Sequence, residues 1–160
     1  MFAKAVLLSA LLLSLAAPLP ALAAGKGKQC FTDAELTAER EVRHGIYLRE
    51  TSRLCQSGGF LKDSFTTWEK FEEVNGARFR AAVGRRAKAW KREFPQDWQS
   101  KQTRADGAIV TYARNLSMVG AVCAQVDKEL KEIGKGGYGK FSARAKLLKN
   151  EVSDDYKPCR

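Results

Sequence analysis

The sequence predicts an all-α protein, an up-and-down helical bundle of three long helices plus one short C-terminal helix, stapled by two disulfides. Three observations lead to this fold class. Apolar residues recur at helical spacing along most of the chain. Alternating runs of β-branched residues, which are typical of strands, do not occur. The four cysteines form an even set in a chain that begins like an exported protein.

Residues 1–23 have the features of a cleaved secretory signal peptide. A basic start at Lys4 precedes the apolar run AVLLSALLLSLAA, and PLPALAA places small residues before the expected cleavage after Ala23. The run is shorter than the roughly 20 residues of a comfortable membrane span, although an uncleaved anchor is the alternative. We therefore expect residues 24–160 to form a single helical domain without a transmembrane span. Its expected location is the periplasm of a Gram-negative bacterium, or otherwise outside the cell.

Two helices are expected in the first half of this domain. The first covers 32–56, beginning at a capping box between Thr32 and Glu35 and ending at SGG. The second starts near Asp63 or Ser64 and ends before Pro95, with Gly76 either bending it or admitting a close neighbour. Its predicted apolar stripe consists of Phe65, Trp68, Phe71, Phe79, Val83, Ala87 and Trp90.

The glycine-rich segment GKGGYGK separates the last two expected helices, 103–134 and 141–152. It matches the G-x-G-x-x-G spacing of nucleotide-binding loops, but such a loop follows a strand, and the preceding residues have helical spacing. We interpret the segment as a hinge in which Gly134 ends the third helix in a left-handed conformation. Lys135 and Lys140 make this segment a basic loop, which is a candidate anion-binding site at the start of the next helix.

The helix positions restrict how the cysteines pair. Cys30 and Cys55 would lie about 35 Å apart at opposite ends of the first helix, whereas a disulfide needs Cα atoms within about 7 Å. An up-and-down bundle instead brings Cys55 near Cys123 and Cys30 near Cys159. We predict these two disulfides, and no metal or cofactor, because the cysteine spacing matches no zinc or haem attachment pattern.

The chain is strongly basic, which favours an anionic partner. Its formal net charge is +10, and removal of Lys4 with the signal peptide lowers this by one. At 100° per residue, the cations Arg78, Arg85, Lys88 and Arg92 cluster opposite the apolar stripe of the second helix, and we call them the basic ridge. The ridge is a candidate anion-binding surface, and the alternative is a solvated face that only keeps the protein soluble.

The first helix has charged residues within its apolar arc. One hypothesis is a polar pocket for a small anion, lined by Arg40, Arg43, His44, Tyr47 and Glu50. The alternative is that these long side chains reach the rim and pair with one another, for example Glu39 with Arg43.

The function expected from these features is a non-enzymatic binding or accessory protein that contacts an envelope polymer, a lipid headgroup or an acidic protein. Nucleic acid is not expected, because no aromatic residue lies in the ridge to stack on bases. No set of residues indicates a catalytic site, and the oligomeric state is left open. The alternatives are an inhibitor- or chaperone-like interaction module and a small cell-envelope hydrolase.

One short segment has a family resemblance. RRAKAWKREF resembles the Arg-Ala-Trp segment of exported lysozyme-inhibitor-like helical domains over ten residues, but the cysteine that closes such segments is missing. We carry no function over from it and recognise no family.

Overall fold

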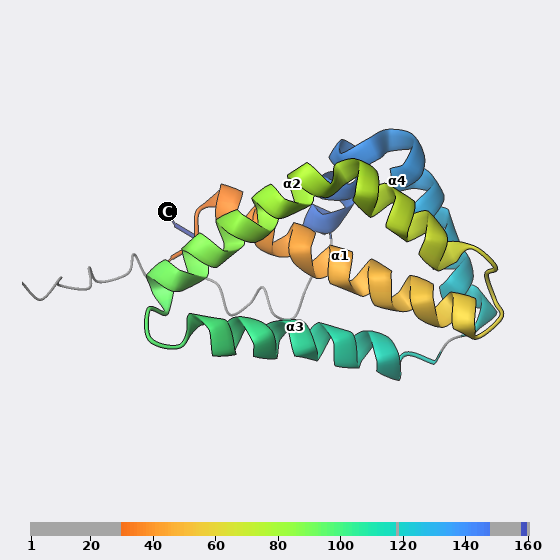
Figure 1. The fold of residues 1–160 in the computed structure, drawn as a ribbon, viewed down its shortest axis with the longest axis horizontal. Coiled ribbons are helices and arrows are strands. Elements are labelled where there is room, and N and C mark those ends of the chain that lie inside the picture. Colours follow the sequence, from red (N-terminus) through yellow and green to blue (C-terminus); the bar gives the residue numbers. More distant parts are fainter. Residues whose placement is uncertain (1–29, 118, 148–157, 160) are drawn as a thin grey trace, which may run out of the picture.

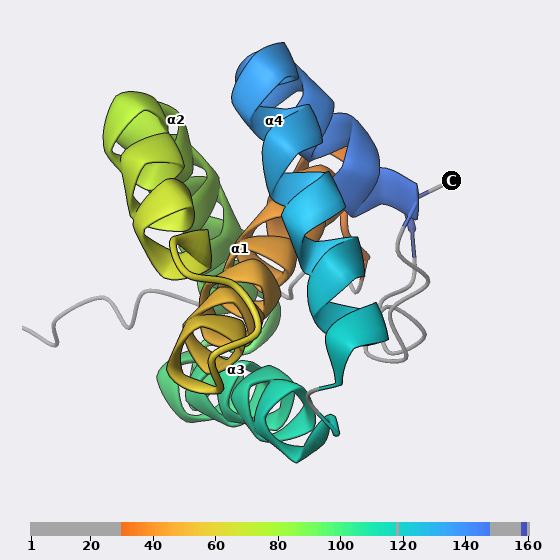
Figure 2. The same ribbon diagram turned by 90° about the vertical axis from the view of Figure 1, so that its right-hand side faces the viewer.

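The computed structural model describes residues 30–117, 119–147 and 158–159. They form four helices, α1 (Asp33–Ser57), α2 (Ser64–Glu93), α3 (Trp98–Asn115) and α4 (Gly120–Leu147). Helix α1 lies in the middle, with α2 and α4 above it and α3 below (Figures 1 and 2). The described residues contain no strand, so the predicted all-α class is confirmed. None of these helices combines the length and apolarity needed to cross a bilayer. The predicted signal peptide, 1–23, lies outside the described residues.

Helix α1 begins at the predicted capping box. The Thr32 backbone N–H donates to the Glu35 carboxylate over 2.9 Å, and the Glu35 N–H donates to the Thr32 hydroxyl over 3.4 Å. These bonds satisfy two backbone donors that have no partner within the helix. The helix ends at Gly58, in the predicted SGG segment.

Helix α2 has the predicted limits, but its buried face is rotated relative to the predicted stripe. Val83, predicted to lie in the core, is 49 % exposed, and Ala82, Arg86 and Ala89 are buried instead. Trp68, Phe71 and Trp90 are buried as predicted. Val83 was wrongly assigned to the core, and Arg86 was missed because the prediction assigned only apolar residues to the interior. Arg86 is buried because acidic side chains on the neighbouring helices accept its hydrogen bonds.

The predicted third helix, 103–134, is in fact parts of two helices. Helix α3 starts earlier, at Trp98, and ends at Asn115, after which Leu116 has an extended backbone with ψ 131°. Ser117 and Gly120 follow, and both residue types favour a helix less than alanine does. The bundle of three long helices and one short helix is therefore corrected: α3 has 18 residues and α4 has 28.

Helix α4 contains the hinge, but not at the predicted residue. The helix continues through Gly134, and the non-helical residue is Gly137, with φ 61° and ψ −161°. At this point the chain turns back towards α1 (Figure 2). The predicted separate helix 141–152 is thus the second arm of α4 as far as Leu147, and residues 148–152 lie outside the described residues.

Replacing Gly137 with alanine is expected to lower the free energy of unfolding by about 1–3 kcal/mol, because its backbone conformation is nearly exclusive to glycine. Urea unfolding followed by circular dichroism measures the change. Gly139 is the matched control, since a Cβ there would meet no atom within 4 Å. Gly139→Ala should be neutral or stabilising by up to about 1 kcal/mol. Equal effects at both positions would contradict the assignment of the hinge.

Both predicted disulfides are confirmed. The Cα atoms of Cys30 and Cys159 are 5.0 Å apart, and those of Cys55 and Cys123 are 5.6 Å apart. Cys123 reaches Cys55 for a different reason from the predicted one. It lies in the first turns of α4, and α4 begins at the end of the molecule where α1 ends (Figure 1).

The core has two parts. The larger part packs α1, α2 and both arms of α4 around Trp68, Phe71 and Phe141. The smaller part lies near the start of α1, where Phe31 and Leu36 pack with Ala89 and Trp90 from the C-terminal end of α2. Because both arms of α4 contribute to the larger part, core packing holds the hinge in place.

Candidate functional site

Helix α2 presents three of the four residues of the basic ridge to solvent. Arg78, Arg85 and Lys88 are exposed. Arg78 and Arg85 are separated by about two helical turns, so they share one side of the helix, and Lys88 lies about one turn further along. The buried residues Ala82 and Ala89 each follow one of these arginines by four residues, so Arg78 and Arg85 border the buried face of α2. These three side chains therefore form a row of cations along α2.

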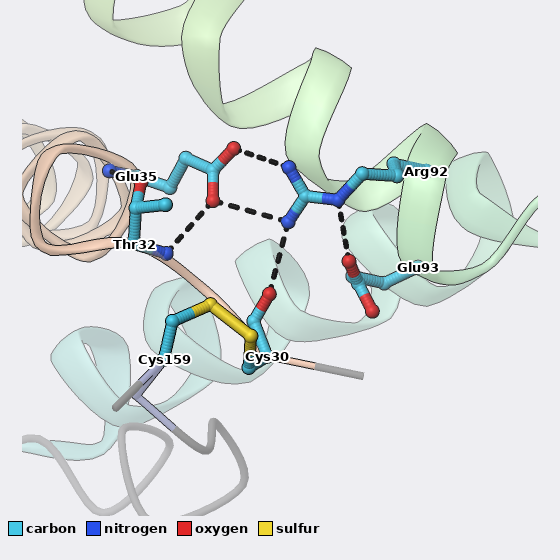
Figure 3. The surroundings of a disulfide bond; sticks show 6 residues. All are labelled: Cys30, Thr32, Glu35, Arg92, Glu93 and Cys159. Atoms are coloured by element: carbon cyan, nitrogen blue, oxygen red, sulfur yellow. Dashed lines mark hydrogen bonds and ion pairs between the residues drawn. A yellow bond between two sulfur atoms is a disulfide. The ribbon is translucent and has the colours of Figure 1, made fainter. Parts of the chain in front are cut away.

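Arg92, the fourth residue of the ridge, has a structural role. Its guanidinium donates to both carboxylate oxygens of Glu35, to Glu93 and to the backbone carbonyl of Cys30 (Figure 3). It therefore ties the end of α2 to the capping box of α1 and to the Cys30–Cys159 disulfide. The hydrogen bonds from Arg92 lower the pKa of Glu35 from its ordinary value of 4.5 to about 2. Arg92 is therefore paired within the protein and is not one of the cations that face solvent.

The Arg92–Glu35 pair is expected to make stability depend on pH below 4.5. Because the pKa of Glu35 is depressed in the folded state, its contribution is fully present above 4.5 and is lost as the pH falls towards 2. Arg92→Met should therefore cost about 1–2 kcal/mol near pH 6 and almost nothing near pH 2. Urea unfolding of both proteins across this range measures the difference.

Lys88→Met is the control for this experiment, because Lys88 is an exposed cation on the same helix. Its effect on stability should stay small, within about 0.5 kcal/mol, at every pH. A cost of Arg92→Met that does not change between pH 6 and pH 2 would refute the assigned role of the pair.

The row of cations on α2 adjoins the glycine-rich segment of α4. The Arg78 guanidinium lies over the Tyr138 ring, 5.6 Å from its centroid, and the Tyr138 hydroxyl donates to Glu41 over 3.1 Å. Burial raises the pKa of Tyr138 and Glu41 adds to this rise, whereas Arg78 and Arg85 act in the opposite direction.

Tyr138 lies in the chain between Lys135 and Lys140, the two cations of the predicted basic loop, and both are exposed. Lys135 and Lys140 thus flank in sequence the residue of α4 that contacts Arg78. We call these five exposed residues the basic surface: Arg78, Arg85, Lys88, Lys135 and Lys140.

A group of buried charges joins α1, α2 and α3. Glu39 accepts hydrogen bonds from Arg43, from the Trp90 indole over 2.7 Å and from Arg86 over 2.7 Å. Arg86 also donates two hydrogen bonds to Asp106, of 3.0 and 2.6 Å. Burial alone would raise the pKa of Glu39, but the nearby guanidinium groups outweigh it and lower the pKa. Arg86 and Asp106 were not predicted, because an arginine within a basic run gives no sequence signal of burial.

The five residues of the predicted polar pocket lie along α1, but those with described partners reach different neighbours. Arg43 pairs with Glu39 on α1, as in the alternative prediction. The imidazole Nε2 of His44 lies 2.8 Å from Glu129 on α4.

Of the remaining three residues, Tyr47 stacks on His44, with ring centroids 6.4 Å apart. Glu50 pairs with Arg114 on α3, at 3.1 Å. Tyr47 and Arg40 are partly buried, and burial raises the pKa of Tyr47. His44 and Glu50 therefore contact residues of other helices, whereas Arg43 pairs within α1.

A depression of about 670 Å³ lies on α2, on a different side from the cations. We call it the α2 depression, and no residue of the predicted polar pocket lines it. Its lining residues are Glu69, Glu72, Glu73, Gly76, Phe79, Arg80, Val83 and Gly84.

Metal ligands are not grouped in the described part of the chain, where no three His, Cys, Asp or Glu side chains are placed to hold an ion. No protein-family model, curated protein or solved structure matches this chain. A function must therefore be argued from the residues described above.

Proposed function

We propose that this protein is an exported, non-enzymatic binding protein that engages an anionic partner through the basic surface. The partner presents phosphate or carboxylate groups, as an envelope polymer, a lipid headgroup or an acidic protein does. In this proposal residues 1–23 direct export, and the oxidising compartment reached in that way allows the two disulfides to form.

The observation that carries the proposal is the contact between Arg78 and Tyr138. It places one cation of α2 against the residue of α4 that lies in sequence between Lys135 and Lys140, which supports a surface made of both basic clusters. In contrast, the buried cation Arg86 and the half-buried Arg92 are paired with carboxylates of the protein itself. Exposed cations that keep their charge for solvent attract anionic surfaces at a distance of about one Debye length, near 8 Å at physiological salt.

Charge reversal tests the proposal. The triple variant Arg78→Glu, Arg85→Glu, Lys88→Glu should bind phosphatidylglycerol vesicles or polyglutamate about 100-fold more weakly than the wild type, at about 1 kcal/mol for each basic residue near an anionic surface. Binding is measured by co-sedimentation and by fluorescence anisotropy. Wild-type binding should weaken strongly as salt increases, whereas phosphatidylcholine vesicles should bind little.

A control variant with the same change in net charge distinguishes binding through the basic surface from binding that depends only on the total charge of the protein. Lys62, Arg104 and Lys128 are exposed and belong to other parts of the chain. Reversing these three should change binding less than about threefold. If both triple variants lose affinity equally, net charge alone explains the binding and the basic surface is not a site.

Other outcomes favour the alternative functions. Binding of an envelope protein that persists at high salt would favour an inhibitor- or chaperone-like module with apolar contacts. Turnover of a cell-wall or lipid substrate that is lost on changing one carboxylate would favour a small hydrolase.

A further inference from the structure

One side of α2 carries cations and exposed apolar residues but no carboxylate. Helix α2 lies along one edge of the molecule (Figure 1). At 100° per residue, six residues between positions 70 and 88 fall within an arc of about 80° around this helix. All six are exposed, and we call them the outer face of α2: Lys70, Val74, Arg78, Ala81, Arg85 and Lys88. The outer face thus contains the three α2 cations of the basic surface and one further lysine.

The cations of the outer face flank its two apolar residues. The two arginines lie at the edge that borders the buried side of α2, and the two lysines lie at the other edge. Val74 and Ala81 lie between these edges. Val74 is 84 % exposed, the highest value among the exposed large hydrophobic side chains of the described residues. An apolar side chain is therefore held in water between positive charges.

We propose that the outer face of α2 lies flat on an anionic lipid bilayer, with Val74 at the boundary between the headgroups and the acyl chains. This inference rests on the proposed function and narrows its partner from any anionic surface to a membrane with anionic headgroups.

The positions of the charges suit a planar partner. Lys70 and Lys88 are separated by about 27 Å along the helix axis, at 1.5 Å per residue. Cations along one straight line of this length can all approach a plane at the same time, and each adds to the attraction of an anionic membrane surface. Glu69 and Glu73 lie outside the arc, towards the α2 depression that they line. Carboxylates therefore do not separate these cations from the membrane.

The exposed valine distinguishes a bilayer from a soluble polyanion. A hydrated polymer offers no apolar surface to Val74, whereas the boundary between headgroups and acyl chains takes apolar side chains out of water. Lysine and arginine side chains are long enough to keep their charged ends among the headgroups while the helix comes closer. Ala81 is small, so it does not hold the helix backbone away from the membrane.

Vesicle binding by serine variants tests the inference. The exported form of the protein is used, because the apolar residues 1–23 would bind vesicles by themselves. Val74→Ser should bind phosphatidylglycerol vesicles about fivefold more weakly than the wild type, because less apolar surface leaves water. Its binding to polyglutamate should not change, because the charge is the same. Val83→Ser is the matched control, since Val83 is 49 % exposed on the opposite side of α2, and both affinities should be unchanged.

Tryptophan variants report where the side chain lies. Val74→Trp should bind phosphatidylglycerol vesicles about threefold more tightly, because tryptophan favours the membrane interface. Brominated acyl chains should quench its fluorescence. Val83→Trp should show neither effect, and the three native tryptophans give the same background in both variants. Circular dichroism confirms that each variant is folded.

The outcomes separate this inference from the proposed function. A wild type that binds polyglutamate but not phosphatidylglycerol vesicles overturns the membrane as partner and leaves an anion-binding protein in place. Equal effects of substitution at positions 74 and 83 also overturn it, even where the triple charge reversal abolishes vesicle binding. A wild type that binds neither probe overturns both proposals.

Discussion

Glu39→Leu is expected to lower the free energy of unfolding by about 3 kcal/mol or more, the largest effect of any single carboxylate in the described residues. The reason is that Glu39 is 4 % exposed and accepts hydrogen bonds from three side chains on two helices. Removing it leaves the buried Arg86 guanidinium with Asp106 alone. Breaking a buried ion pair from one side costs about 3–5 kcal/mol, because the remaining charge stays out of water without compensation. Urea unfolding near pH 7 measures the loss.

An exposed ion pair provides the control for this prediction. Asp127 and Lys131 lie 2.6 Å apart on α4, but their side chains are 36 % and 68 % exposed. Asp127→Ala should cost less than about 1 kcal/mol. The double variant Glu39→Leu, Arg86→Met should recover part of the loss, since the two residues share one interaction. A cost for Glu39→Leu no greater than that for Asp127→Ala would show that the buried group adds little stability.

The double variant Cys55→Ala, Cys123→Ala is expected to lose about 4 kcal/mol of stability. This disulfide closes a loop with a sequence separation of 68 residues, and its removal lets the unfolded chain regain the corresponding conformational entropy. It also ties the end of α1 to the start of α4, directly after the break that follows α3. Urea unfolding under oxidising conditions measures the loss.

Reduction of a variant that retains only this disulfide is the control for a local packing effect of the alanines. Cys30→Ala, Cys159→Ala retains only the Cys55–Cys123 bridge, so reducing this variant should reproduce the loss caused by the first double variant. An unfolding midpoint for Cys55→Ala, Cys123→Ala that equals that of the oxidised wild type would contradict the prediction.

The start of α1 was predicted correctly because it depends on a local rule, and a Cys30–Cys55 bridge was excluded by a geometric one, whereas the Cys55–Cys123 pair was predicted from a bundle geometry that differs from the observed one. A capping box specifies the start of α1, and a continuous helix between Cys30 and Cys55 excludes their pairing. The break after Asn115 and the hinge at Gly137 were not predicted. Helical periodicity continues through both, and several nearby glycines were equally able to hold a positive φ. Phe141, four residues after Gly137, is packed in the core.

The candidate site was predicted only in part, for a related reason. A helical wheel gives the angular position of a side chain but not its partner. Arg85, Arg86 and Arg92 all lie in one basic run, yet the first is exposed, the second is buried against Glu39, and the third is bound to Glu35. The carboxylates that separate them come from other helices, so tertiary contacts decide which arginines remain available to a ligand.

The Cys30–Cys159 bridge has a mechanical consequence. The bridge joins residues 129 positions apart, close to both ends of the described chain, and all four helices lie within the loop that it closes. A pulling force applied to the two termini is transmitted through the sulfur atoms of Cys30 and Cys159 and therefore does not act on the helices between them. Under tension the oxidised protein should behave as a short inextensible link, and only after reduction should it lengthen by the contour of the whole domain.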